Sequence, residues 1–370
     1  MTRDLVGLAL LAVFCIFISP FYKELTIVKR YIAPSNIPSN IQPSVTERPK
    51  TIVFLSDTFL PKTFAGSELS GYETLKFLRD KGHSCKLFLK EVVVNEYNGF
   101  PIHQFDLKDR FCMTQIQNAD IVFFQMTGTP DNFKAIQERT KPTFLFIHVV
   151  NSYNWLLQQK VSFPVVIIYN SHMTQNILPT LYDNMRMIPY VNTDRFKSLR
   201  TYTIQTSKVT LINCNINKGG KLFKELAYKL PNVQFLGVKG GYADQIIDES
   251  PPANLVYIES QKDISVVFKT TGILVMPSKN ETWGRTAVEA MAAGVPVIHS
   301  ESAGLVECVG GAGIMCIHDD IDAWAEAIQR IIGDRAYREQ LRQYGFKRIG
   351  EIEQEQIRGR EELARKIEIS

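Results

Sequence analysis

The residues best suited to chemistry lie in the segment Met276–Ile298, where a polar loop joins an apolar run to an alanine-rich stretch. Glu281 stands in the loop, and Glu289 stands eight residues later inside the predicted helix. A helix that begins near Gly284 directs free N–H groups and the positive end of its dipole at the loop, and both favour a phosphate. Carboxylates beside such a site can accept hydrogen bonds from sugar hydroxyls. In the alternative interpretation Glu281 caps the helix and Glu289 faces solvent, and the spacing alone leaves both interpretations open.

The elements that must hold this loop follow from an alternation that begins at Thr51. Short apolar runs rich in β-branched and aromatic residues alternate with amphipathic stretches such as Ser67–Asp80, which is typical of βαβ units on a parallel sheet. Because the runs are apolar on both faces, we expect helices to cover both faces of each sheet. The predicted strands are Thr51–Leu55, Cys85–Leu89, Ile121–Gln125, Thr143–Ile147 and Val165–Tyr169 in the first half, and Lys208–Asn213, Val233–Leu236, Asn254–Ile258, Ile273–Met276, Val295–His299 and Ile314–Ile317 in the second.

The chain divides into two such halves. Its 370 residues are enough for two domains and a small third element, and the helical signal lapses over Pro189–Arg200. We therefore predict two doubly wound, Rossmann-like α/β domains, residues 50–195 and 196–345, and a C-terminal helix over residues 346–370, within a charged helical pattern that begins at Asp334. Ligands bind outside the carboxyl ends of the strands in such sheets, so we expect the site in a cleft between the two domains.

The first 49 residues differ from the rest. Leu5–Tyr22 is an uncharged run of 18 residues, at the short end of what crosses a bilayer. Residues 23–49 include a Pro-, Ser- and Asn-rich stretch typical of an extended tether. We predict a transmembrane helix within residues 1–22 and a flexible stem over residues 23–49. The chain is therefore predicted to be a single-pass membrane protein. The lysines and arginines that flank the apolar run favour a body in the cytosol over one in the lumen. The alternatives are a buried helix and a cleaved signal peptide, although no small-residue cleavage site follows the run.

The composition excludes several classes of function. A net charge of +4 without a long basic stripe argues against nucleic acid as a partner. The six cysteines are scattered without a CxxC pair, so neither a zinc site nor a disulfide framework is implied. No dinucleotide fingerprint or Walker loop is present, which disfavours NAD and ATP chemistry. Asp320 and Asp322 formally match a metal-binding DxD pair, but capping of the amphipathic helix that follows explains them better, so no metal or other cofactor is predicted.

The segment around the two glutamates resembles the E-x7-E signature of the large retaining glycosyltransferase family four (glycosyl transferases group 1), whose members share the two-domain GT-B fold. The shared features are a Pro-Ser pair, Glu281, the aromatic-glycine pair Trp283-Gly284, a Glu-Ala-Met-Ala run from Glu289, and a glycine followed by Pro-Val-Ile. Further similar pieces extend the resemblance from about Thr51 to Tyr344, and they are Ala65-Gly66-Ser67-Glu68, Phe77-Leu78 with Lys81-Gly82-His83, Ile147-His148, Ile188–Phe196 and Lys218-Gly219.

The resemblance implies a nucleotide-diphosphate sugar donor that is held mainly by the second domain. Glu289 matches the glutamate that holds the nucleotide ribose, and Glu281 matches the one that meets hydroxyls of the transferred sugar. Lys218 matches the lysine that neutralises the diphosphate as it leaves, and a fixed cation of that kind stabilises the transition state without a metal. The backbone at Trp283, Gly284 and Arg285 is expected to meet the sugar or the diphosphate.

The first domain is implied to bind the acceptor. Gly66 is expected to close over the phosphates or the acceptor, and His148 to lie near the donor sugar, with a histidine satisfied at a strand end as the alternative. One position departs from the family, because Asn213 stands where its members have an arginine that helps to hold the diphosphate. Asn is a neutral donor and cannot replace that charge, so Arg285 or Lys239 would have to compensate.

The resemblance thus implies a metal-independent glycosyltransferase that acts with retention of configuration. No motif in the first domain specifies the acceptor, whether glycan, lipid or protein. Two alternatives stay open. One is another enzyme of the same fold, such as a nucleotide-sugar epimerase or a phosphorylase, and the other is a catalytically weak module that binds glycans or partners. Asn213 is the feature that keeps the second alternative open.

Overall fold

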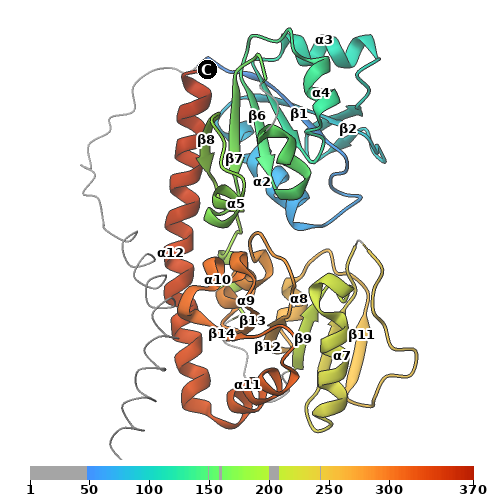
Figure 1. Cartoon of the computed structure of the whole chain (residues 1–370), viewed down its shortest axis with the longest axis vertical. Helices are drawn as coiled ribbons and strands as arrows, with labels where there is room; N and C mark the ends of the chain where they lie inside the picture. Colours follow the sequence, from blue (N-terminus) through green and yellow to red (C-terminus); the bar gives the residue numbers. More distant parts are fainter. Residues whose placement is uncertain (1–47, 149, 158–160, 200–207, 242) are drawn as a thin grey trace, which may run out of the picture. The chain divides into compact units, whose positions relative to one another are not determined.

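In the computed structural model, two sheets and the helices around them form a unit that begins at Arg48 and runs to Ser370 (Figure 1). The predicted transmembrane helix and nearly all of the predicted stem lie outside the described residues. Within the described part, no helix is both long and apolar enough to cross a membrane. The residues that the structure describes are 48–148, 150–157, 161–199, 208–241 and 243–370.

The first half of the unit is built on eight strands, which are β1 (Thr51–Ser56), β2 (Ser84–Leu89), β3 (Glu96–Tyr97), β4 (Phe100–Gln104), β5 (Ile121–Gln125), β6 (Thr143–Ile147), β7 (Val165–Tyr169) and β8 (Asp183–Arg186). They form one sheet in the order β3-β4-β2-β1-β5-β6-β7-β8. All neighbours are parallel except β3 and β4, which pair antiparallel at one edge. The chain first adds strands on one side of β1 and then on the other, so its winding reverses between β1 and β5.

The second half repeats this plan with six strands, which are β9 (Lys208–Ile212), β10 (Phe235–Val238), β11 (Leu255–Ile258), β12 (Thr271–Met276), β13 (Val297–Ser300) and β14 (Ile314–Cys316). They form a sheet in the order β11-β10-β9-β12-β13-β14, and every pair is parallel. The winding reverses here between β9 and β12. The two Rossmann-like α/β halves confirm the predicted fold class.

The helices are α2 (Gly66–Asp80), α3 (Arg110–Asn118), α4 (Pro130–Ala135), α5 (His172–Ile177), α6 (Asp194–Lys197), α7 (Gly220–Lys229), α8 (Ser265–Phe268), α9 (Arg285–Ala293), α10 (Ala303–Val309), α11 (Ile321–Gly333) and α12 (Arg335–Glu368). Every residue of the central strands β5, β6, β7 and β12 is buried. The expectation that both faces of each sheet are covered is therefore confirmed.

All eleven predicted strands are present, with shifts at some ends. No end shifts by more than two residues, and both ends shift by two only at β10, which was predicted at Val233–Leu236 and is found at Phe235–Val238. Three strands at the edges of the first sheet, β3, β4 and β8, were not predicted. β3 has only two residues, β4 contains Pro101, and β8 buries only Met185 among polar neighbours. Short polar strands with proline are typical of sheet edges, and they carry no apolar run by which a strand is recognised.

The long helix α12 packs on both halves of the unit (Figure 1). Near its start, Gly345 packs against Met291 of α9 in the second half. Near its end, Leu363 and Ile367 are buried in the same core as Met185 of the first half. At 34 residues the helix is about 50 Å long, since each residue adds about 1.5 Å.

Ion pairs between α12 and β8 accompany this packing. Arg186 and Glu355 are 3.2 Å apart, and Lys366 lies 2.8 Å from Asp183. The predicted helix over residues 346–370 is thus the later part of a helix that begins at Arg335. That helix joins the second half back to the first.

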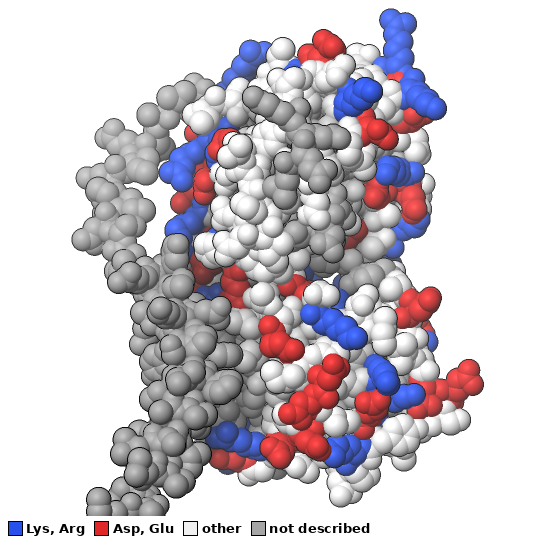
Figure 2. Space-filling view, in the orientation of Figure 1, with Lys and Arg blue, Asp and Glu red and all other residues white. Residues whose placement is uncertain are grey.

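Charged side chains of both signs are interspersed on the face of the molecule that Figure 2 shows. Lysines and arginines do not merge into one continuous patch over the described residues on that face. Positive charge that could bind a ligand therefore has to be assigned to individual residues of the site.

Candidate functional site

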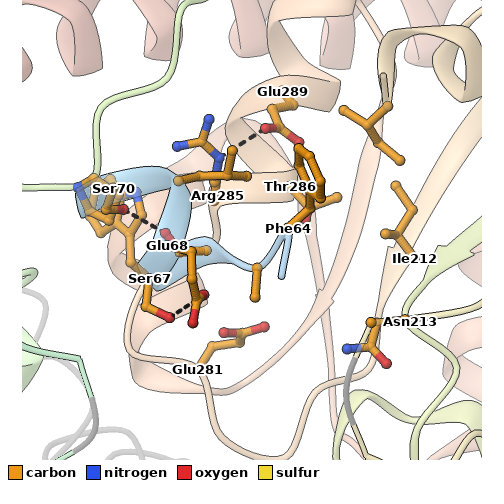
Figure 3. A pocket seen from close by; sticks show the side chains of 18 of the residues that line it. Phe64, Ser67, Glu68, Ser70, Ile212, Asn213, Glu281, Arg285, Thr286 and Glu289 are labelled. Atoms are coloured by element: carbon orange, nitrogen blue, oxygen red, sulfur yellow. Dashed lines mark hydrogen bonds and ion pairs between the residues drawn. The ribbon is translucent and has the colours of Figure 1, made fainter. Parts of the chain in front are cut away.

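A pocket of about 1280 Å³ opens at the carboxyl ends of the strands of both sheets (Figure 3). Its lining includes Thr58 after β1, His148 after β6, Asn213 after β9 and Ser278 after β12. The pocket therefore lies beside both points at which the winding reverses, where doubly wound sheets bind their ligands. Of the nine predicted site residues, eight line this pocket and Gly284 does not.

The loop between β12 and α9 is fixed by backbone hydrogen bonds to the segment after β13. The Glu281 N–H donates to Ser302 Oγ (2.7 Å), and the Gly304 N–H donates to the Glu281 carbonyl (3.2 Å). Gly284 is the N-cap residue of α9 and has no side chain to cap it. A Cβ at Gly284 would lie 2.7 Å from Leu305 Cδ2, so glycine is required there by close packing. Gly284 thus positions the loop without itself reaching the pocket.

Lys218 and Glu281 form an ion pair within the pocket. Glu281 Oε1 also accepts a hydrogen bond from Ser278 Oγ (3.3 Å). The Lys218 N–H donates to Asn215 Oδ1 (2.9 Å), which holds the lysine at the end of the helical turn Ile216–Lys218 before α7. Because Glu281 bonds to Lys218 and leaves α9 uncapped, the interpretation of Glu281 as a helix cap is wrong.

Glu289 and Arg285 face one another on the first turns of α9 (Figure 3). Arg285 Nε donates to Glu289 Oε1 (3.1 Å), and its Nη1 donates to the carbonyl of Tyr190 (2.6 Å). The Glu289 side chain is only 8% exposed, so the interpretation that it faces solvent is wrong. Burial raises the pKa of the Glu289 carboxyl, and the Arg285 charge acts in the opposite direction.

Asn213 is buried with φ of +69°, a left-handed conformation that Asn tolerates better than most residues. Its Oδ1 accepts hydrogen bonds from Asn215 Nδ2 and Gln245 Nε2, each at 3.0 Å. Gly240 makes room for this arrangement, since a Cβ there would lie 2.2 Å from Asn213 Cγ. The two amides engage the oxygen of Asn213 and leave its NH2 group to face the pocket as a neutral donor (Figure 3).

Two cations that could compensate for Asn213 also line the pocket, and each has a carboxylate partner. Arg285 pairs with Glu289, and Lys239 pairs with Glu259 at 2.5 Å. Their positive charge is therefore present in the pocket wall, already partly neutralised.

His148 lies at the end of β6. Its Nε2 is 3.2 Å from Gln125 Oε1, and its ring stacks on Phe146 with ring centroids 5.7 Å apart. A carboxamide oxygen only accepts, so this contact is a hydrogen bond in the tautomer that has its proton on Nε2. Desolvation lowers the pKa of His148 to about 4, so the ring is neutral at neutral pH. His148 thus contacts another side chain of the protein, as expected for a histidine that is satisfied at a strand end. It also lines the pocket.

The remaining predicted residues have different surroundings. The Trp283 side chain is 4% exposed and packs in the core with Leu305 and Ala287. Gly66 is the first residue of α2 and is exposed, and a Cβ there would meet nothing within 4 Å. Trp283 is thus mainly a packing residue, whereas Gly66 leaves an open stretch of backbone on the wall opposite α9.

Several pocket residues of the first half were not singled out by the sequence. Glu68 is 6% exposed and accepts hydrogen bonds from Thr58 Oγ1 and Ser67 Oγ, each at 2.8 Å. Its signal was its place in the motif that ends Gly66-Ser67-Glu68. Tyr97 also lines the pocket, and it comes from the unpredicted strand β3, so no pattern in the sequence placed it there.

Asp320 and Asp322 are the pair that formally matches a metal-binding DxD motif. Among the described residues, no three His, Cys, Asp or Glu side chains lie close enough together to hold a metal ion. Asp320 is the N-cap of α11, where its side chain accepts from the Ala323 N–H (3.0 Å), so the capping interpretation of this residue is confirmed.

Comparison with known proteins gives the site a context. Residues 215–348 match the family model described as "Glycosyl transferases group 1". The chain is 30% identical over 135 residues to the capsular polysaccharide biosynthesis glycosyltransferase CapM of Staphylococcus aureus, which is 34% of this chain and 36% of that protein. It is 33% identical over 122 residues to a D-inositol 3-phosphate glycosyltransferase of Mycobacterium marinum, which is 29% of this chain and 26% of that protein. The chain thus spans about a third or less of the length of these relatives.

The similarity in fold to solved structures covers both halves of the chain. Alr3699/HepE of Anabaena, solved in complex with UDP-glucose, superposes with a TM-score of 0.68 over 85% of this chain and 99% of that one, at 15% sequence identity. At that level of identity the likeness concerns the fold. It covers both sheets, whereas the sequence matches are confined to shorter segments.

Proposed function

We propose that this chain belongs to the glycosyl transferases group 1 family, whose model matches residues 215–348, and that it has the GT-B fold. We propose further that it is an enzyme that moves a sugar from a nucleotide-diphosphate donor to an acceptor. The observation that carries the proposal is the pairing of Lys218 with Glu281 in the same pocket as Glu289 and the N-terminus of α9. One cation, two carboxylates and a helix N-terminus suit a ligand that has both phosphates and hydroxyls.

The donor is proposed to lie mainly on the second half. Glu289 would accept hydrogen bonds from the ribose hydroxyls, and Glu281 from hydroxyls of the transferred sugar. The diphosphate would lie between Lys218 and the first turn of α9, where Asn213 offers an uncharged N–H donor. The UDP-glucose complex of Alr3699/HepE supports a nucleotide sugar as the ligand of this fold.

The proposed reaction is a metal-independent displacement with retention of configuration. The bond between the sugar's anomeric carbon and the diphosphate oxygen breaks, and an acceptor oxygen bonds to that carbon on the same face. The acceptor's proton passes to the departing phosphate oxygen, so no protein base is required. Lys218 and the helix dipole stabilise the charge that develops on the diphosphate, which is the step at which fixed charges contribute most.

A second candidate is a catalytically weak module that binds glycans, which the missing arginine at position 213 favours. The two candidates differ in whether nucleotide is released. Transfer releases free nucleoside diphosphate only when an acceptor is supplied, whereas a binding module releases none. An epimerase would convert the nucleotide sugar without any acceptor.

The test uses the purified full-length chain and a panel of UDP-, GDP-, ADP- and dTDP-sugars, each with and without a mixture of glycan acceptors. Acceptor-dependent release of nucleoside diphosphate from one donor supports the proposal. Lys218→Ala should abolish the release, whereas Lys221→Ala should not, because Lys221 is exposed on α7 and does not line the pocket. Nucleotide-sugar binding without release under any condition would refute transfer.

We also propose that residues 1–22 anchor the chain in a membrane with its body in the cytosol. The uncharged run and the basic residues after it support this. Extraction of cell membranes at alkaline pH should leave the full chain in the pellet and release a variant without residues 1–22. Protease treatment of sealed vesicles then reports the side on which the body lies.

A further inference from the structure

The two walls of the pocket carry opposite charge. Five lysines and arginines of the second half line it, and Arg195 of α6, which is paired with Asp263 of the second half, adds a sixth. The second half also contributes two carboxylates, Glu281 and Glu289. Among the described lining residues from Thr58 to Asn192 there is no lysine or arginine, and there are two carboxylates, Glu68 and Glu73. The nearest lysine in sequence, Lys62, is not in the lining and is paired with Glu91. An anionic group in the pocket therefore has favourable partners on one wall only.

Glu68 is the carboxylate that a ligand on the first half would meet. It lies in the first turn of α2, where the helix dipole stabilises negative charge. Thr58 and Ser67 each donate one hydrogen bond to a different one of its oxygens. Figure 3 shows Glu68 and Glu281 pointing into the pocket from opposite walls. Glu281 is neutralised by Lys218, and among the described residues no cation pairs with Glu68.

Glu73 differs from Glu68 in that it has a cation beside it. Its carboxylate lies 3.6 Å from Arg360 of α12, which is itself not in the lining of this pocket. The unneutralised negative charge of this wall is therefore concentrated at Glu68.

Aromatic side chains complete the same wall. Phe64, Tyr72 and Tyr97 line the pocket, and the rings of Tyr72 and Tyr97 are 5.8 Å apart in an edge-on arrangement. Tyrosine offers a broad apolar face together with a hydroxyl, so this surface suits a ring that has both apolar and hydroxyl-bearing faces.

We infer that the acceptor is an uncharged, hydroxyl-rich glycan and that Glu68 binds one of its hydroxyls and excludes phosphorylated acceptors. The inference rests on the proposed function, since it assigns the cationic wall to the donor diphosphate. A carboxylate accepts hydrogen bonds from hydroxyls with the strength of a charged partner. The same carboxylate repels a phosphate, because no cation on its wall is available to offset the charge.

The experiment uses acceptors in pairs that differ by one phosphate, such as D-inositol with D-inositol 3-phosphate and glucose with glucose 6-phosphate, together with a panel of neutral and phosphorylated oligosaccharides. With the donor found in the release assay, kcat/KM is measured for each acceptor on the full chain. We expect the neutral acceptors to be preferred by about tenfold or more, the size of one unfavourable charge contact.

Glu68→Gln tests the assignment to this residue. The variant keeps the shape and removes the charge, so the KM for the neutral acceptor should rise about tenfold while kcat and the donor KM stay the same. The ratio of kcat/KM for the neutral acceptor to kcat/KM for its phosphorylated partner should be smaller in this variant than in the wild type. Asp80→Asn is the matched control, because Asp80 is exposed at the other end of α2 and does not line the pocket.

The outcomes separate the two proposals. Donor turnover with a preference for phosphorylated acceptors, or with no neutral glycan accepted, overturns the inference and leaves the transferase proposal standing. A neutral preference that Glu68→Gln does not alter overturns the role of Glu68. Failure of every donor to bind or react overturns the proposed function, and the inference falls with it.

Discussion

Lys218 and Glu281 are 63 residues apart in the sequence and form an ion pair inside the pocket. They come from two separate connections in the second half of the chain. Lys218 lies in the turn before α7, and Glu281 lies in the loop after β12. Each neutralises the charge of the other. A bound donor would have to share or replace this contact, which makes the pair a direct target for mutation.

Removal of either partner should abolish most of the turnover. With Lys218→Ala or Glu281→Ala we expect kcat to fall by about 100-fold or more, which is typical when one fixed group that stabilises developing charge is lost. The measurement is nucleoside diphosphate release with the donor that the wild-type chain uses. Glu225→Ala, an exposed carboxylate of α7 outside the pocket, should behave like the wild type. Equal kcat in all variants would show that the pair takes no part in the reaction.

Gly219→Ala should weaken both stability and nucleotide binding. Gly219 has φ of +85°, and a Cβ there would lie 2.4 Å from Pro277 Cγ. We expect the free energy of unfolding to fall by more than about 1 kcal/mol, because alanine disfavours this conformation and the contact adds strain. Urea denaturation measures the first effect, and calorimetric titration with UDP measures the second.

Gly333→Ala serves as the control for that variant. Gly333 ends α11, and a Cβ there would meet nothing within 4 Å. Its replacement should leave stability unchanged or slightly increased. Equal effects of the two substitutions would contradict the role given to the Gly219 conformation.

His148 should make the protein less stable in acid. Its pKa is about 4 in the folded protein and near its ordinary value of 6.5 in the unfolded chain. Between these values the unfolded chain binds more protons, so the stability falls as the pH drops from 6.5 towards 4, and above 6.5 this residue adds no pH dependence. At its steepest, the change is about 1.4 kcal/mol per pH unit.

Urea denaturation across this range compares the wild type with His148→Gln. The variant should lose that part of the acid destabilisation, and its unfolding free energy should vary less with pH. Parallel pH profiles of the two proteins would show that the imidazole is not desolvated in the folded state.

Leu363→Ala should test the attachment of α12 to the first half. Leu363 is fully buried in the core that contains Met185, so we expect a loss of about 2–5 kcal/mol in the free energy of unfolding. Ile357→Ala on the same helix is the control, because Ile357 is 49% exposed, and its loss should be below about 0.5 kcal/mol. Similar losses in both variants would mean that the end of α12 is not packed as described.

Much of the architecture could be predicted from local patterns. β5, β6 and β7 are continuous apolar runs bounded by polar residues, and they lie where those runs predicted them. β8 could not be found in this way, because its pairing with β7 fixes it rather than its own composition. The course of α12 across both halves was likewise hidden, since a charged helical pattern shows that a helix forms and not what it packs against.

The site shows the same division. The positions of Glu281 and Glu289 around the start of a helix followed from the order of residues. Their partners did not, because the contact with Lys218 depends on how β9 and β12 lie side by side. Glu68 and Tyr97 were missed for the same reason, as their importance comes from facing a pocket whose other wall lies more than a hundred residues away in the chain.

The two halves are connected twice, once by the chain between β8 and β9 and once by α12. Two bodies joined by a single link can turn about any axis through that link, whereas two bodies joined at two places keep only the rotation about the line through both. A motion that opens the pocket would therefore involve both connections at once. A ligand that touches both walls would add a third connection between the halves.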